Sequence, residues 1–153
     1  EQLYQQLFRL HLRLSEQQTC QLAADCMQLE IFSQLFNRYG EVEQSITSTI
    51  GIKQIHLLRD YLMANLSEKI ALSDLADLCQ LSESQLLRQF KRRVGLTPYA
   101  WLTRLRLEKA LVLLRAGESS TDVAHKVGFY DQAHFVKAFK LAYGTTPSKI
   151  PQM

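Results

Sequence analysis

The sequence is poor in residues that interrupt helices and in residues that cross-link a chain. It has six glycines and three prolines among 153 residues, so we expect regular secondary structure over most of its length and little disorder. Its three cysteines, Cys20, Cys26 and Cys79, are odd in number and include no C-x-x-C pair, which predicts reduced thiols packed in helices. No histidine stands at metal-ligand spacing from them, so neither a metal site nor another cofactor is predicted.

Long apolar runs are absent too. No stretch of about 18 apolar residues exists, and the first residues lack the charged-then-apolar order of a signal peptide, so we expect a soluble, cytoplasmic protein with no membrane partner. The chain begins with Glu1 rather than Met, which predicts a processed chain or a part of a longer protein. Its length allows one or two small domains.

Charge is distributed unevenly along the chain. Residues 1–52 hold three basic and six acidic residues, whereas residues 53–153 hold fifteen basic and nine acidic ones. The C-terminal part therefore attracts polyanions and the N-terminal part repels them. A positive surface that merely interacts with water explains this charge as well as a nucleic-acid partner does, so charge alone leaves both interpretations open.

Helical periodicity dominates the N-terminal part. Leucines at three- and four-residue steps predict an amphipathic helix over residues 2–14. A capping box of Ser15 and Gln18 predicts a second helix, which ends near Gly40. We expect the two helices to pack as an antiparallel hairpin over residues 1–40. A hairpin buries too little surface to be stable alone, so it needs another domain or a second copy of itself.

The rest of the chain is predicted to be a linker followed by a second helical domain. Residues 41–52 are rich in Ser, Thr and Gly, which favours a linker, and residues 53–153 form the second domain. A helix is expected over 53–64. Ser73 is then expected to cap a short helix that runs to Cys79.

A repeat organises this second domain. The segment "FKRRVGLTP", residues 90–98, recurs as "FKLAYGTTP", residues 139–147, with five of nine positions identical. Short helical segments, "SDLADLC" and "TDVAHKV", precede the two copies at matching distances. The sequence therefore predicts an all-α fold with two helix–turn–helix units, about 53–98 and 117–150, joined by a long linking helix from about Tyr99 to Ala116.

The second helix of each unit combines an apolar stripe with a polar, basic face. In the first unit a capping box of Ser82 and Gln85 predicts the start of this helix, and Leu86 and Phe90 lie opposite Arg88. This plan is typical of a helix that enters the major groove of DNA. Side chains toward the helix ends are better placed for phosphates, which fix position without reading sequence. The predicted phosphate contacts are Lys91, Arg92, Arg93, His134 and Lys140.

Three segments together resemble the AraC/XylS family of transcription regulators: "LADLCQLSESQLLRQFKRRVGLTP", "RLRLEKALVLL" and, most specifically, "DVAHKVGFYDQAHFVKAFKLAYGTTPSKI". The resemblance covers residues 53–150. It implies a sequence-specific DNA-binding regulator whose two recognition helices enter successive major-groove turns, about 34 Å apart, on one face of double-stranded DNA. The base contacts that it implies are Ser84, Gln85, Leu87, Arg88, Gln132, Ala133, Val136 and Lys137.

The resemblance also implies partners. Many members of the family activate transcription by contacting RNA polymerase, and many bind a small-molecule effector in an N-terminal domain that is mostly missing from this sequence. Residues 1–39 resemble, less specifically, the helical tail of that domain, which often serves dimerisation. We therefore expect an activator and a homodimer formed through residues 1–39.

The sequence departs from the family pattern in the first unit. Gln80 stands at the turn position that Gly128 keeps in the second unit, and a left-handed backbone there would cost Gln80 about 1 kcal/mol. Ser84 and Leu87 are poor hydrogen-bonding readers of bases, so specificity in this unit is expected to depend on Arg88 and Gln85. Leu87 could contact a thymine methyl group or pack on the linking helix.

Two other classes of function fit the sequence less well. A helical protein-interaction module without specific DNA binding would need an apolar outer face, and the outer face here is basic. An enzyme is not expected, because the sequence offers no nucleophile–base pair, metal constellation or glycine-rich phosphate loop.

Overall fold

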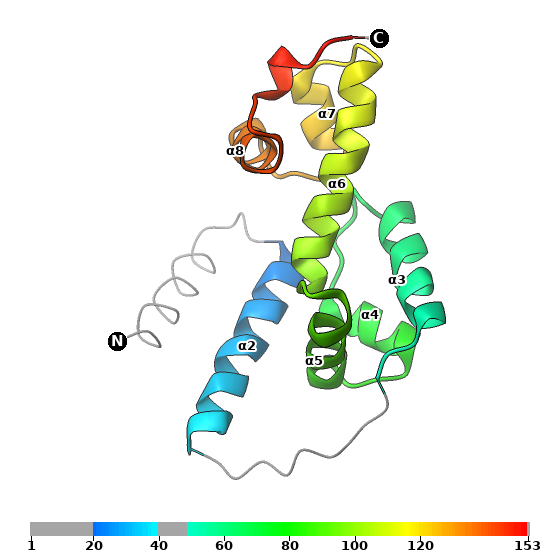
Figure 1. Ribbon diagram of the computed structural model, residues 1–153, viewed down its shortest axis with the longest axis vertical. Coiled ribbons are helices and arrows are strands. Elements are labelled where there is room, and N and C mark those ends of the chain that lie inside the picture. The colour runs from blue at the N-terminus through cyan, green and yellow to red at the C-terminus, as the bar shows by residue number, and fades with distance from the viewer. Residues whose placement is uncertain (1–19, 40–48, 153) are drawn as a thin grey trace. The chain divides into compact units, whose positions relative to one another are not determined.

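The computed structural model describes residues 20–39 and 49–152, and every regular element in these ranges is helical. The predicted all-α class is therefore confirmed for the described residues. The predicted helix over 2–14 and the box of Ser15 and Gln18 lie outside them, as does most of the predicted linker. The elements are α2 (Gln21–Tyr39), α3 (Ile52–Ala64), α4 (Leu72–Cys79), α5 (Glu83–Val94), α6 (Pro98–Arg115), α7 (Ser120–Lys126), α8 (Gln132–Tyr143) and the 3-10 helix η1 (Pro147–Lys149) (Figure 1).

The helices form two compact units. The first contains the described residues up to Arg59 together with Lys69–Tyr99, and the second contains Asp60–Glu68 and the chain from Ala100 onward. The predicted linking helix is α6, which begins at Pro98 in the first unit and runs to Arg115 in the second.

The first unit is a helix–turn–helix of α4 and α5 against which α2 also packs. Leu22, Ala23 and Cys26 of α2 are buried, as are Leu86 and Phe90 of α5, the two residues expected to form its apolar stripe. Burial raises the pKa of the Cys26 thiol to about 12, so this cysteine stays neutral and unreactive at ordinary pH.

The start of α4 differs from the sequence prediction. Ser73 was expected to cap this helix, but it lies inside the first turn, and the N-cap residue is Ala71. The prediction of Ser73 as the cap is therefore wrong. The Asp74 carboxylate accepts a hydrogen bond from the Ala71 N–H at 2.8 Å, and the Asp25 carboxylate of α2 accepts one from the Leu72 N–H at 2.9 Å. Two carboxylates thus satisfy two of the free backbone donors at the start of this helix.

The turn and the second helix of the first unit follow the sequence prediction. Gln80 adopts a left-handed conformation with φ 55°, and it is the one non-glycine residue with positive φ among those described. The Ser82 hydroxyl accepts from the Gln85 N–H at 3.2 Å, and the Ser82 N–H donates to the Gln85 side-chain oxygen at 3.1 Å. The expected capping box is therefore confirmed, and Gly95, with φ 81°, ends α5.

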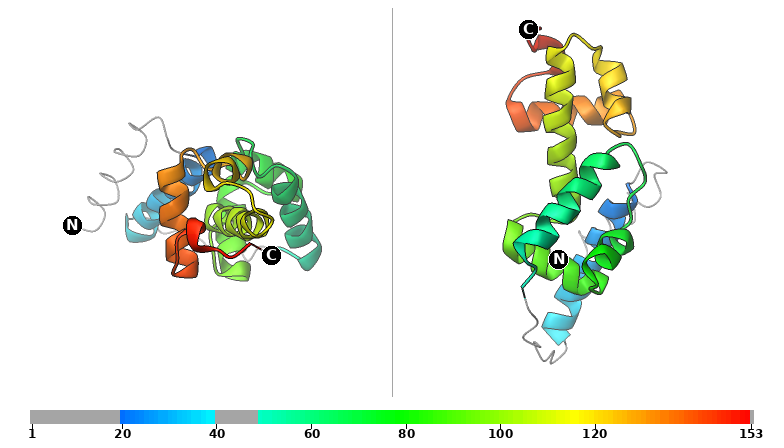
Figure 2. Two further views of the ribbon diagram at one scale, coloured as in Figure 1. Left: turned by 90° about the horizontal axis from the view of Figure 1, so that it is seen from above. Right: turned by 90° about the vertical axis from the view of Figure 1, so that its right-hand side faces the viewer.

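The second unit gathers α7, α8 and η1 around the part of α6 that belongs to it (Figures 1 and 2). Ser119 caps α7 by accepting from the Asp122 N–H, and Asp131 caps α8 by accepting from the His134 N–H at 2.7 Å. The core of the unit is apolar and joins all three longer helices; it consists of Leu107, Ala110, Leu114, Val123, Ala124, Val127, Phe129, Phe135 and Phe139.

Gly128 fixes the turn of the second unit against the loop that follows α3. It has φ 87°, and a Cβ atom at this position would lie 2.2 Å from the Leu66 carbonyl oxygen. The buried Arg106 donates its Nε–H to the same carbonyl at 2.9 Å. Glycine is therefore required here for two reasons, a left-handed backbone and a close backbone approach.

Candidate nucleic-acid interface

The outer face of α5 carries most of the predicted contacts of the first unit. Ser84 and Arg88 are exposed, and so are the three cations at the end of the helix, Lys91, Arg92 and Arg93. These last residues also complement the negative end of the helix dipole. The face is polar and cationic, which a groove lined by phosphates would attract.

Two predicted base contacts in α5 have other neighbours in the structure. Leu87 is only 6% exposed, so its side chain lies within the unit. Gln85 uses its amide oxygen to accept from the Ser82 N–H, and this leaves the amide N–H donors for another partner. Bidentate reading of adenine needs both the oxygen and the nitrogen of the amide, so Gln85 would first have to give up its cap.

The outer face of α8 is similar but more open. Gln132, Ala133, His134 and Lys137 are exposed, Lys140 is exposed one turn later, and Val136 is partly buried. The His134 ring packs edge-on against Phe129, with ring centroids 5.2 Å apart. Lys137 stands at the position that Arg88 holds in α5, on the side opposite the buried Phe135 and Phe139.

One predicted phosphate contact is already engaged. The Lys91 ammonium forms an ion pair with Glu30 of α2, with a distance of 2.6 Å from Nζ to Oε1. The side chains are 57% and 33% exposed, so the pair is open to water and to competing ions. Nothing in the spacing of either residue indicated this pair, since 61 positions separate them.

Arg106, like Glu30, was not predicted from the sequence to have a specific contact. It resembles its exposed neighbour Arg104 in "RLRLEK", yet it is 6% exposed. A helical projection would have found it, because Arg106 follows the buried Leu102 by four residues and shares its face. Its Nε–H donates to the Leu66 carbonyl, and its burial leaves little of the side chain on the surface.

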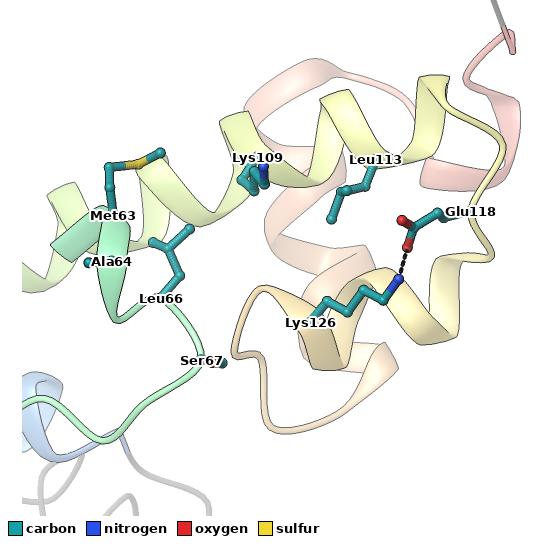
Figure 3. Close-up of a pocket in the computed structure, with 8 residues that line it drawn as sticks. All are labelled: Met63, Ala64, Leu66, Ser67, Lys109, Leu113, Glu118 and Lys126. Atoms are coloured by element: carbon teal, nitrogen blue, oxygen red, sulfur yellow. Dashed lines mark hydrogen bonds and ion pairs between the residues drawn. The ribbon is translucent and has the colours of Figure 1, made fainter. Parts of the chain in front are cut away.

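The second unit also has a shallow pocket of about 300 Å³ (Figure 3). The Lys126 ammonium and the Glu118 carboxylate pair across one side of it at 2.6 Å. Within residues 20–39 and 49–152, no cluster of three or more His, Cys, Asp or Glu side chains is arranged to hold a metal ion. Among the same residues, no helix combines the length and apolar character needed to cross a membrane.

Comparison with known proteins agrees with this geometry. A family described as "Helix-turn-helix domain" matches residues 75–152, about half of the chain. The HTH-type transcriptional activator RhaS of Escherichia coli O1:K1 / APEC is 39% identical over 119 residues, which are 77% of this chain and 42% of that protein. The chain thus spans about two fifths of the length of this relative.

Two solved structures share the fold. One is the C-terminal domain of the two-component response regulator yesN from Fusobacterium nucleatum subsp. nucleatum ATCC 25586, with a TM-score of 0.59, 27% identity, and 65% of this chain and 99% of that chain covered. The other is a transcriptional regulator with an AraC-type DNA-binding domain from Chromobacterium violaceum, with a TM-score of 0.60, 26% identity, and 63% and 88% covered.

Two helix–turn–helix units in tandem, each with a capped second helix and a polar outer face, define a protein of the double helix–turn–helix class. The family match confirms the resemblance read from the sequence. The chain belongs to the AraC/XylS family of DNA-binding transcription regulators, which are not enzymes.

Proposed function

We propose that the chain is the DNA-binding part of a sequence-specific transcription activator, with α5 and α8 reading two successive segments of the major groove. The observation that carries the proposal is the equivalence of Arg88 and Lys137. Both are exposed, and they occupy the same position in two recognition helices, α5 and α8, whose N-termini are capped by side chains. A repeated cation at a base-reading position suits guanine O6 and N7.

The remaining contacts divide by chemistry. Gln132, at the start of α8, can reach adenine N6 and N7, and Val136 can meet a thymine methyl group. Arg92, Arg93 and Lys140 lie toward the helix ends and suit phosphates, which contribute affinity and salt dependence but no sequence information.

Membership of the family supports further proposals about partners. The relative RhaS is named a transcriptional activator, which supports contact between this chain and RNA polymerase. We place dimerisation in residues 1–39 and a small-molecule effector in a domain outside this sequence. A regulator of this kind works beside the chromosome, so we assign it to the cytoplasm.

Selection of bound sites from random double-stranded DNA tests the proposal. We expect two short motifs about one helical turn apart, and binding that weakens steeply as salt rises. Binding that recovers no common motif and responds little to salt would contradict the proposal and favour a protein-interaction module instead.

A further inference from the structure

The ion pair between Glu30 and Lys91 places an acidic side chain on a surface that otherwise presents cations. Lys91 lies on the outer side of α5, one turn after Leu87, and its ammonium is 2.6 Å from the Glu30 carboxylate of α2. A carboxylate and a DNA phosphate are both anions that bind an ammonium ion through charge-assisted hydrogen bonds. The ammonium has three N–H donors, so the competition is mainly one of charge: the Glu30 carboxylate offsets the positive charge of Lys91 and weakens its attraction for phosphate.

The two recognition helices provide an internal comparison. The first unit has α2 packed on α4 and α5, whereas α8 of the second unit packs on α7 and η1. Leu87 in α5 is 6% exposed, while Val136, at the matching position of α8, is partly exposed. The matching position is therefore more deeply buried in the unit that contains α2.

The position of α2 is fixed by more than this exposed ion pair. Its buried residues Leu22, Ala23 and Cys26 anchor it in the unit, and Asp25 accepts a backbone hydrogen bond from Leu72 at the start of α4. Apolar burial holds α2 in place, and Glu30 is carried to Lys91 as a consequence. The pair is thus a feature of the folded unit and not a chance meeting of two long side chains.

We propose that α2 is an inhibitory helix of the first recognition helix: Glu30 neutralises Lys91 and lowers the affinity of α5 for DNA until phosphate displaces it. This inference rests on the proposed function, because it concerns the regulation of the same DNA-binding face. It also identifies a route by which a signal from the N-terminal side of the chain would reach DNA, since any shift of α2 frees Lys91.

A comparison of Glu30→Gln with the wild-type chain tests the inference on the DNA site that selection yields. Fluorescence anisotropy over a range of salt concentrations gives both affinity and salt slope. We expect Glu30→Gln to bind about two- to fivefold more tightly at low salt, the range set by an exposed ion pair. The salt slope should steepen by up to about one counterion, as for one added phosphate contact.

The chain offers a matched control in its second unit. Glu118 pairs with Lys126 at the same 2.6 Å, with side-chain exposures of 28% and 57% against 33% and 57% for Glu30 and Lys91. Glu118→Gln changes the net charge equally but leaves the recognition helices alone. Thermal unfolding checks that each variant is folded, and Glu30→Ala serves as a second removal of the carboxylate.

Lys91→Ala completes a double-mutant cycle. If Glu30 acts through Lys91, the gain from Glu30→Gln disappears in a Lys91→Ala background. Equal gains from Glu30→Gln and Glu118→Gln, or a gain that survives Lys91→Ala, would overturn the inference while the wild-type chain still bound its site with a steep salt dependence. Failure of every variant, wild type included, to bind DNA would instead overturn the proposed function and this inference with it.

Discussion

At the scale of single residues, the two turns show how one backbone geometry is met by two different side chains. Gln80 and Gly128 hold equivalent positions, with φ of 55° and 87°. Gln80 is exposed and tolerates the left-handed conformation at a moderate cost. Gly128 has no such freedom, because the Leu66 carbonyl oxygen occupies the space where a Cβ atom would stand.

We therefore expect opposite effects from exchanges at the two turns. Gln80→Gly should raise the free energy of unfolding by up to about 1 kcal/mol, since relief of left-handed strain outweighs the added flexibility of the unfolded chain. Gly128→Ala should lower it by more than that, through strain and a 2.2 Å approach to backbone. Urea denaturation measures both. A stabilising Gly128→Ala would show that the Leu66 loop moves aside freely.

Base reading is also a matter of single residues. Arg88→Ala and Lys137→Ala should each reduce discrimination at particular base pairs by about 1–3 kcal/mol. Lys140→Ala is the matched control, because loss of a phosphate contact weakens all sequences alike and reduces the salt slope by about one. Binding assays on the selected site and its single-base variants separate the two patterns. Uniform weakening by Arg88→Ala would make Arg88 a phosphate contact.

At the scale of helices, the buried thiol of Cys26 links the docking of α2 to pH. Burial raises its pKa from 9.0 to about 12, so above pH 9 the unfolded chain loses a proton that the folded chain keeps. The stability contributed by the neutral thiol is present below pH 9 and is lost as pH rises from 9 toward 12. We expect the free energy of unfolding to fall by roughly 1 kcal/mol between pH 8 and 10 through this thiol.

Denaturation of the wild-type chain and of Cys26→Ala at the two pH values isolates this effect. Lysines and tyrosines titrate in both proteins, so the difference between the proteins belongs to Cys26. Between the two pH values, the free energy of unfolding should fall less in Cys26→Ala than in the wild-type chain, and the difference is the contribution of the thiol. Identical pH dependence in both proteins would show that the thiol reaches water in the folded state.

The helices also show which features local sequence can predict. The capping box of Ser82 and Gln85 was predicted because it depends only on residues within one turn. The start of α4 was predicted wrongly; one of the two carboxylates that cap it, Asp74, is local, but the other, Asp25, lies 47 residues away from Leu72. The pair of Glu30 and Lys91 likewise joins residues far apart in the sequence, and the burial of Leu87 was left open by its position on the helix. Contacts between α2 and helices far from it in the sequence cannot be predicted from the spacing of neighbouring residues.

At the scale of the whole molecule, the structure shows where one charge of the acidic N-terminal part lies. Residues 1–52 are acidic on balance and residues 53–153 are basic. The structure places one of those acidic side chains, Glu30, directly on the basic face of α5. Glu30 therefore brings a negative charge to the helix that we propose reads DNA, where it opposes the attraction of the neighbouring cations for phosphate.

Dimerisation through residues 1–39 is the last prediction, and α2 supplies its described part. One face of α2 is used within the unit, but Phe32 is 48% exposed, which leaves a large apolar side chain available to a second copy. We expect sedimentation equilibrium of the intact chain to give about twice 17.6 kDa at micromolar concentration. Phe32→Ser should shift the equilibrium toward single chains, whereas Gln34→Ser, at an exposed position two residues later, should leave it unchanged. If the wild-type chain has the mass of a single chain at every concentration, residues 1–39 do not form a dimer. If both variants shift the equilibrium equally, Phe32 is not part of the contact between the two copies.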